Sequence, residues 1–201
     1  MAFHSADHDE SGKRLGMWLF LYTEIVLFGG LFVLYAVYLT FYPEDFIDGG
    51  RQLNRVLGLV NTIILLISSF GVAASITAVQ KGQKTLGLAA LTATQICGAI
   101  FLVNKYFEWG HKIHNGIYPN SDLLLDGPAG QNIFFGLYYV VTGLHAIHII
   151  VGMSLLAVAM GFWASNRITA KRFGLLENAG LYWHLVDLVW IFIFPLFYLI
   201  I

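Results

Sequence analysis

The sequence YWHLVDLVW at residues 182–190 lies in an apolar run that continues to the end of the chain. This run is long enough to cross a bilayer, yet His184 and Asp187 stand three residues apart and therefore share one face of a helix. Lipid does not satisfy the hydrogen bonds of such a face, so another helix of this chain or another protein must cover it. The segment thus predicts a membrane helix that belongs to a larger bundle.

The composition of the whole chain indicates the same class of protein. Of the 201 residues, 58% are hydrophobic and 11% are charged, whereas about 25% of the residues in soluble domains are charged. The formal net charge of -1 gives nucleic-acid binding no electrostatic support. The single cysteine, Cys97, excludes a disulfide framework and a cysteine-based metal or cluster site.

Five apolar stretches each approach or exceed the roughly 20 residues that cross the hydrocarbon layer. The sequence therefore predicts an all-α polytopic membrane protein with a polar N-terminal segment at residues 1–14 and one five-helix domain at residues 15–201. The first stretch lacks the cleavage site of a signal peptide, so we take Met1 as the mature start. Turn formers between Gly110 and Gln131 predict a loop without a strand. The predicted spans are Leu15–Phe41, Leu53–Val79, Leu86–Phe107, Asn132–Trp163 and Ala179–Ile201.

Lysines and arginines are unevenly distributed between the two ends of the predicted bundle. Because the cytoplasmic side of a membrane protein is richer in these residues, we expect a cytoplasmic N-terminus and a C-terminus outside. The richer end holds Lys13, Arg14, Lys81, Lys84, Arg167, Lys171 and Arg172, and the poorer end holds Arg51, Arg55, Lys105 and Lys112.

Glu24 is the ionisable residue that lies deepest in the first predicted span. It follows Leu15 by nine residues, which places it about 14 Å along a helix and close to the bilayer centre. A carboxylic acid there can remain neutral and form a hydrogen bond between helices, or it can act directly in proton handling or lipid contact. The sequence leaves both roles open.

Glu108, His111 and His114 have the single-turn spacing that can bind a metal. They are expected at the outer rim of the bundle beside Lys112, where an interfacial polar cluster is the better interpretation. A membrane metalloenzyme that uses this cluster is kept as an alternative.

His145 and His148 lie three residues apart in the middle of the fourth span. A haem or copper site would need a further histidine at a comparable depth, and His184 is expected near the inner end of its own span. The sequence therefore favours hydrogen bonds between helices. The candidate partners are Glu24, Glu108, Tyr138 and Thr142.

Asp187 can fix the tautomer and orientation of His184, or either residue can reach Arg14 or Glu177. No nucleophile accompanies the pair, so a hydrolytic triad is not supported. We expect no catalytic residue and no metal ligand, with Glu24 as a membrane-embedded carboxylate. The expected buried polar network consists of Glu108, His145, His148, His184 and Asp187.

Five motifs give the sequence a strong resemblance to subunit III of the haem-copper oxidases. They occur in the family order and extend over nearly the whole chain from Gly12 onwards. The last motif is the most specific, and the histidine motif of the fourth span is the next. The motifs are LGMWLF (15–20) with Thr23-Glu24, Asn61-Thr62 with Leu65-Leu66 and Ser68, FEW (107–109), GLHAIH (143–148) with Val151-Gly152, and YWHLVDLVW (182–190).

The resemblance implies a subunit without haem or copper in a bacterial inner-membrane complex that reduces oxygen to water and pumps protons. Subunits I and II carry the redox chemistry, while subunit III stabilises subunit I, binds phospholipid and influences proton uptake or oxygen access. Glu24 matches the family's membrane-embedded carboxylate, and the residues of the expected polar network match further family positions.

Cytochrome c is the expected electron donor. A subunit of a quinol oxidase and an accessory protein of nitric oxide reductase are the alternatives. Longer family members have seven helices, of which this chain resembles the last five, so another subunit or bulk lipid is expected where the first two would lie.

Overall fold

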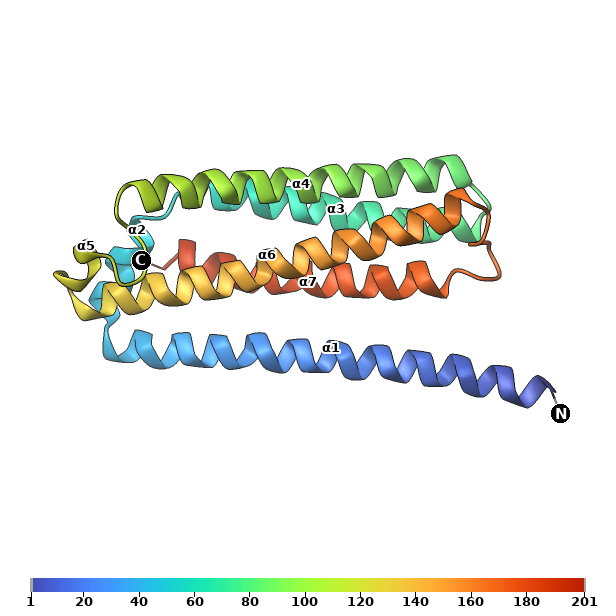
Figure 1. Ribbon diagram of the computed structural model, residues 1–201, viewed down its shortest axis with the longest axis horizontal. Helices are drawn as coiled ribbons and strands as arrows, with labels where there is room; N and C mark the ends of the chain where they lie inside the picture. Colours follow the sequence, from blue (N-terminus) through green and yellow to red (C-terminus); the bar gives the residue numbers. More distant parts are fainter. Residues whose placement is uncertain (1, 201) are drawn as a thin grey trace.

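The computed structural model describes residues 2–200, with side chains from residue 15 to residue 200. Five long helices lie roughly side by side, with α1 set apart from the other four (Figure 1). Each of the five contains a stretch that is long and apolar enough to cross a membrane. The predicted all-α bundle with five membrane spans is therefore confirmed. The helices are α1 (Ala2–Phe41), α2 (Pro43–Arg51), α3 (Arg55–Gln80), α4 (Lys84–His114), α5 (Asp122–Leu125), α6 (Ala129–Ala164) and α7 (Gly174–Tyr198).

Four of the long helices extend several residues further than the apolar stretches predict. Helix α1 begins at Ala2, within the predicted polar segment, α4 runs to His114, α6 begins at Ala129 and α7 begins at Gly174. Polar residues next to the apolar stretches therefore also adopt helical structure. The predicted loop from Gly110 to Gln131 is correspondingly shorter and contains α5. Hydropathy detects only the part of a helix that lies in the hydrocarbon, which explains these differences.

Residues at their N-terminal ends determine where the two short helices begin. Pro43 is at the start of α2, where the backbone N–H that proline lacks would have no partner within the helix. The acidic residues in the first turn of α2 interact favourably with the positive end of the helix dipole. Helix α5 begins after Ser121, whose hydroxyl accepts a hydrogen bond from the backbone N–H of Leu124 at 3.3 Å. Within residues 2–200 the structure contains no strand, only an isolated bridge between Thr169 and Arg172.

Helices α3, α4, α6 and α7 form the compact part of the molecule. Helix α3 packs against α4 and α7, and α6 packs against α4 and α7. Helix α1 touches α2, α6 and α7 but makes no contact with the described parts of α3 and α4. Only 11% of the residues in the apolar stretch of α1 are buried, against 50% in α7, so α7 is the central helix and α1 is peripheral.

Candidate functional site

Glu24 of α1 and His148 of α6 form a pair between the two helices. The Glu24 Oε2 atom lies 2.7 Å from Nε2 of His148, and the other ring nitrogen, Nδ1, lies 2.7 Å from the carbonyl oxygen of Leu144. A carbonyl can only accept, so Nδ1 carries a proton. The pair therefore holds one further proton between its facing atoms, on the carboxyl group or on Nε2.

Aromatic side chains enclose this pair from two helices. The ring of Phe28 meets the His148 ring edge to face at 5.2 Å, and Tyr182 of α7 stacks on it at 6.4 Å. The two members of the pair keep 15% and 12% of their side-chain surface exposed. Of the candidate partners predicted for His148, the structure thus places Glu24 against it.

Lys105 and Glu108 of α4 form a buried ion pair with two tyrosines. Lys105 Nζ lies 2.9 Å from Glu108 Oε2, 3.1 Å from the Tyr138 hydroxyl and 2.7 Å from the Tyr198 hydroxyl. The Tyr138 and Tyr198 hydroxyls donate to Glu108 Oε1 at 2.9 and 2.8 Å. The network joins α4, α6 and α7, and the rings of Tyr138, Trp190 and Tyr198 surround the ammonium group at 5.0 to 5.4 Å.

This network bears on two expectations from the sequence. Glu108 is buried, whereas His111 and His114 are exposed, so the three side chains do not form one polar cluster at the surface. Lys105 was counted among the flanking charges of one end, but it is only 2% exposed. The signal that points to its place is the Lys105-x-x-Glu108 spacing, which puts two opposite charges on one face of a helix in an apolar run.

His145 lies at the centre of the four compact helices. Its ring packs against Trp190 at 5.1 Å and against the edge of Phe101 at 5.5 Å. Both ring nitrogens are buried without a hydrogen-bond partner among the described residues. Thr142, one of its predicted partners, instead donates to the Tyr138 carbonyl oxygen.

His184 faces α3 and does not bond to Asp187. Its Nδ1 atom lies 2.5 Å from the Ser69 hydroxyl, and both carboxyl oxygens of Asp187 are buried without a partner in the described part of the chain. Of the two other predicted partners, Arg14 has a side chain outside the described residues, and the structure gives Glu177 no hydrogen bond with the pair. Ser69 is the partner that sequence reasoning missed, because only the packing of α3 on α7 brings it close.

The depth expected for His184 was wrong. Because α7 begins at Gly174, His184 lies ten residues into the helix, about 15 Å along its axis, and not near its end. Its neighbour Tyr182 stacks on His148, so His148 and His184 lie at similar depths. They nevertheless bond to different helices, and among the described residues no three His, Cys, Asp or Glu side chains gather as a metal site would require.

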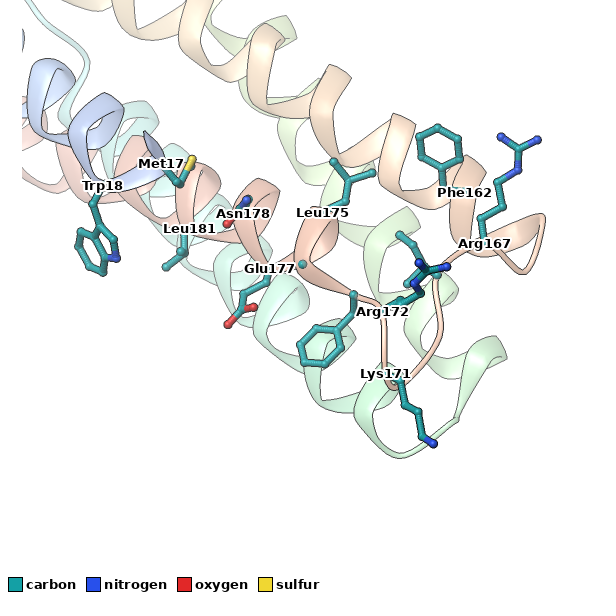
Figure 2. A pocket seen from close by; sticks show the side chains of 13 residues that line it. Met17, Trp18, Phe162, Arg167, Lys171, Arg172, Leu175, Glu177, Asn178 and Leu181 are labelled. Carbon is teal, nitrogen blue, oxygen red and sulfur yellow. The ribbon is translucent and has the colours of Figure 1, made fainter. Parts of the chain in front are cut away.

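A cavity of about 830 Å³ opens beside the first turns of α7. Met17 and Trp18 of α1 form one wall, and the connection between α6 and α7 forms the other (Figure 2). Its lining includes three cations and one acid, together with apolar side chains. The charged lining residues are Arg167, Lys171, Arg172 and Glu177.

Comparisons with known proteins show similarity to one protein family over nearly the whole chain. The family model described as "Cytochrome c oxidase subunit III" matches residues 3–200. The chain is 30% identical to the cytochrome bo(3) ubiquinol oxidase subunit 3 of Pseudomonas aeruginosa, over 98% of this chain and 89% of the relative.

Two further relatives show how widely the match extends. The cytochrome c oxidase subunit 3 of Synechocystis is 32% identical over 94% of this chain and 76% of its own length. The heme-copper oxidase subunit I+III of Aeropyrum pernix is 28% identical over 93% of this chain, which corresponds to 22% of that longer protein. The chain therefore belongs to the cytochrome c oxidase subunit III family.

Proposed function

We propose that this chain is the non-redox subunit III of a proton-pumping haem-copper oxidase, with cytochrome c as the electron donor. The match to the family over residues 3–200 is the observation that carries this proposal. The contacts of the histidines are consistent with it, because His148 and His184 are held by Glu24 and Ser69 in bonds between helices. The chain then contributes to the complex by packing and binding, while the other subunits carry the electrons.

Purification through a tag on this chain tests the proposal. Mild detergent extraction should recover haem-containing subunits together with the chain, and the complex should consume oxygen with reduced cytochrome c. After gentle separation, metal analysis of the chain alone should find no stoichiometric iron, copper or zinc. One bound equivalent of any of these metals would contradict the proposal and favour the metalloenzyme alternative.

A quinol oxidase is the second candidate complex. The similarity to the ubiquinol oxidase subunit of Pseudomonas aeruginosa, at 30% identity, favours it about as strongly as the Synechocystis relative favours cytochrome c. The copurified subunit II separates the two candidates, since a dinuclear-copper cysteine motif indicates a cytochrome c oxidase. Oxygen consumption with ubiquinol but not with reduced cytochrome c would assign the quinol oxidase.

Subunit I is the partner that we propose for this chain. The Aeropyrum pernix relative is named as a subunit I+III, and this chain matches about a fifth of its length. Fusion keeps two partners at a high effective concentration, and it requires that they can lie side by side. Stabilisation of subunit I is therefore the contribution that we assign to the bundle.

We also propose that the cavity beside α7 holds the headgroup of a phospholipid. Arg167, Lys171 and Arg172 line it together with apolar side chains of α1 and α7, which suits a phosphate group above acyl chains. The Arg167→Gln/Arg172→Gln variant should copurify with less phospholipid per complex, measured by mass spectrometry of the extracted lipid. Arg51→Gln is the control, because Arg51 pairs with Asp48 at the other end of the bundle; equal losses in both variants would refute the site.

We propose a cytoplasmic N-terminus and an outside C-terminus. Exposed cations lie in the α3–α4 and α6–α7 connections, whereas Lys105 and Lys112 of the other end are buried. Removing these two from the count increases the asymmetry on which the orientation depends. A C-terminal fusion to alkaline phosphatase should be active and a C-terminal fluorescent protein dark, and the reverse pattern would invert the proposal.

A further inference from the structure

A continuous series of tyrosine and tryptophan rings connects the core of the bundle with its surface. The ring centroid of Trp190 lies 6.3 Å from that of Tyr198, which lies 6.2 Å from that of Tyr138. The Tyr139 ring follows at 5.4 Å from Tyr138, and the Trp109 ring at 5.6 Å from Tyr139. Trp190, Tyr138 and Tyr198 are buried, whereas Tyr139 and Trp109 are half-buried. We call these five residues the aromatic chain.

The members of the aromatic chain share a chemical property that phenylalanine lacks. Phenol and indole rings can lose one electron to a strong oxidant, and the vacancy is filled by an electron from a neighbouring phenol or indole. The rings of Phe101 and Phe135, which pack against Trp190 and Tyr138, are not oxidised in this way. The aromatic chain therefore provides a route by which a one-electron oxidation at the surface reaches the core.

The place where such an oxidation settles depends on where a proton can go, because an oxidised tyrosine is a strong acid. The hydroxyls of Tyr138 and Tyr198 donate to Glu108 Oε1 at 2.9 and 2.8 Å, and a carboxylate can accept their protons. The Tyr139 hydroxyl instead donates to a backbone carbonyl oxygen at 2.9 Å, which cannot take a proton. The indole N–H of Trp109 has no acceptor among the described residues. The oxidation therefore settles on Tyr138 or Tyr198.

Lys105 determines how strong the oxidant must be. Its ammonium group donates to the hydroxyls of Tyr198 and Tyr138 at 2.7 and 3.1 Å, and the oxygen of an oxidised tyrosine can still accept such a bond. Once Glu108 has taken up the proton, however, the buried ammonium has lost its counter-charge, which costs free energy. The two tyrosines therefore stay reduced in the presence of weak oxidants and react only with strong ones.

We infer that Tyr138 and Tyr198 form a trap for oxygen-derived radicals that reach the bundle at Trp109. A peroxyl radical takes one electron from the Trp109 indole and one proton from water, and becomes a hydroperoxide. An electron from one of the two trap tyrosines passes through Tyr139 to Trp109. The phenol proton moves to Glu108 Oε1, and a neutral tyrosyl radical remains. A one-electron reductant such as ascorbate returns the electron, and Glu108 returns the proton.

This trap goes beyond the proposed function and takes no part in the reduction of oxygen. The expected source of the radicals is oxygen reduction in the same complex, so the origin of the oxidant rests on the proposed function. The chemistry of the two tyrosines does not, because it uses only side chains of this chain.

Flash oxidation of the purified chain tests the trap without other subunits. Tris(bipyridine)ruthenium(II) and persulfate generate a strong one-electron oxidant in solution, and freezing after the flash preserves the radicals for high-field electron paramagnetic resonance. We expect a tyrosyl signal whose largest g value is lowered by the hydrogen bond from Lys105. Tyr138→Phe/Tyr198→Phe should remove this component. The control Tyr22→Phe/Tyr106→Phe, at positions that are 64% and 75% exposed, should leave it unchanged.

Trp109→Phe tests the route and leaves the hydrogen bonds of the two trap tyrosines intact. The hydrogen-bonded tyrosyl signal should form several-fold more slowly in this variant. Trp18→Phe is the matched control, because Trp18 is 63% exposed and lies outside the aromatic chain. Glu108→Gln keeps an acceptor for the two hydroxyls but cannot take up their proton, so the tyrosyl signal should be lost and a tryptophan radical should accumulate instead.

Two results would overturn the inference. The trap is wrong if the hydrogen-bonded signal survives in Tyr138→Phe/Tyr198→Phe. The route is wrong if Trp109→Phe and Trp18→Phe form the signal equally fast, and this comparison decides even where the double variant is unstable. Since the measurement uses the chain by itself, either result leaves the proposed function standing, and a failure to copurify haem-containing subunits leaves the trap standing.

Discussion

Lys105 illustrates how a charge is accommodated inside this bundle. The three protons of its ammonium group match three acceptors, namely Glu108 Oε2 and the hydroxyls of Tyr138 and Tyr198. The two hydroxyls in turn donate to Glu108 Oε1. Every polar atom of the side chains therefore has a partner, which is the condition under which a buried ion pair can repay its desolvation.

Removing one member of this pair should be far more harmful than removing both charges. Glu108→Leu leaves the Lys105 ammonium buried without its counter-charge, and we expect a loss of about 3–5 kcal/mol in the free energy of unfolding. The loss is measured as a lower midpoint of thermal unfolding of the detergent-purified chain, with size-exclusion chromatography as the monitor of folded protein.

The double variant Lys105→Met/Glu108→Leu is the matched control for that experiment. It removes both charges, so it should recover a large part of the stability that Glu108→Leu loses. A double variant as unstable as the sum of the two single variants would show that the ion pair does not act as one unit.

Substitution of Glu24 is expected to change the rate of oxygen consumption by the assembled complex. Glu24→Gln keeps a hydrogen-bonding group opposite Nε2 of His148, so we expect normal assembly and haem content. Because an amide cannot carry the shared proton, we expect slower oxygen consumption or earlier inactivation during sustained turnover. Turnover and durability identical to those of the unsubstituted complex would make Glu24 a packing residue only.

Among the packing contacts between helices, those of Trp183 join α7 to α3, α4 and α6. Its indole N–H donates to the Ser68 hydroxyl of α3 at 3.0 Å, and its ring lies beside Gly98 of α4 and Gly152 of α6. A Cβ atom added at Gly152 would come within 2.9 Å of the indole ring, and one at Gly98 within 3.0 Å. The two glycines therefore allow α7 to insert the Trp183 indole between α4 and α6.

Gly152→Val should loosen this contact between α6 and α7. Overpacking of a tight site costs about 1–3 kcal/mol, so we expect a lower midpoint of thermal unfolding. Gly136→Val on the same helix is the control, because an added Cβ there meets nothing within 4 Å. Equal midpoints for the two variants would rule out the close approach at Gly152.

Hydropathy was sufficient to predict the five spans, but it gave no account of α2 or of the helical ends beyond the hydrocarbon. The motif spacing likewise brought out Glu24 and His148, and named one as a candidate partner of the other. The spacing of Lys105 and Glu108 indicates a pair on one helix face, but it does not show that α6 and α7 bury the pair. Ser69 gave no signal, because a serine in an apolar helix has an ordinary sequence context. The positions of Lys105 and Ser69 follow from how α3, α4 and α7 pack, which periodicity alone does not determine.

The molecule as a whole consists of a four-helix body and a peripheral helix. Few contacts attach α1 to the body apart from the Glu24–His148 pair, the Tyr35 hydroxyl bonded to the Leu196 carbonyl oxygen, and a stripe of aromatic contacts. The Lys105–Glu108 network and the Trp183 contacts lie entirely within the body. The stability of the four-helix body should therefore depend little on whether α1 is attached to it.

Cleavage after α1 tests this separation. A protease site inserted after Phe41, which is 71% exposed, permits cutting of the folded and purified chain. We expect the body to keep nearly its full unfolding midpoint, because its own contacts are intact, while α1 is released as detergent concentration rises. Glu24→Leu should release α1 at lower detergent, since His148 then loses its partner; cleavage that unfolds the body would show instead that α1 is an integral part of the core.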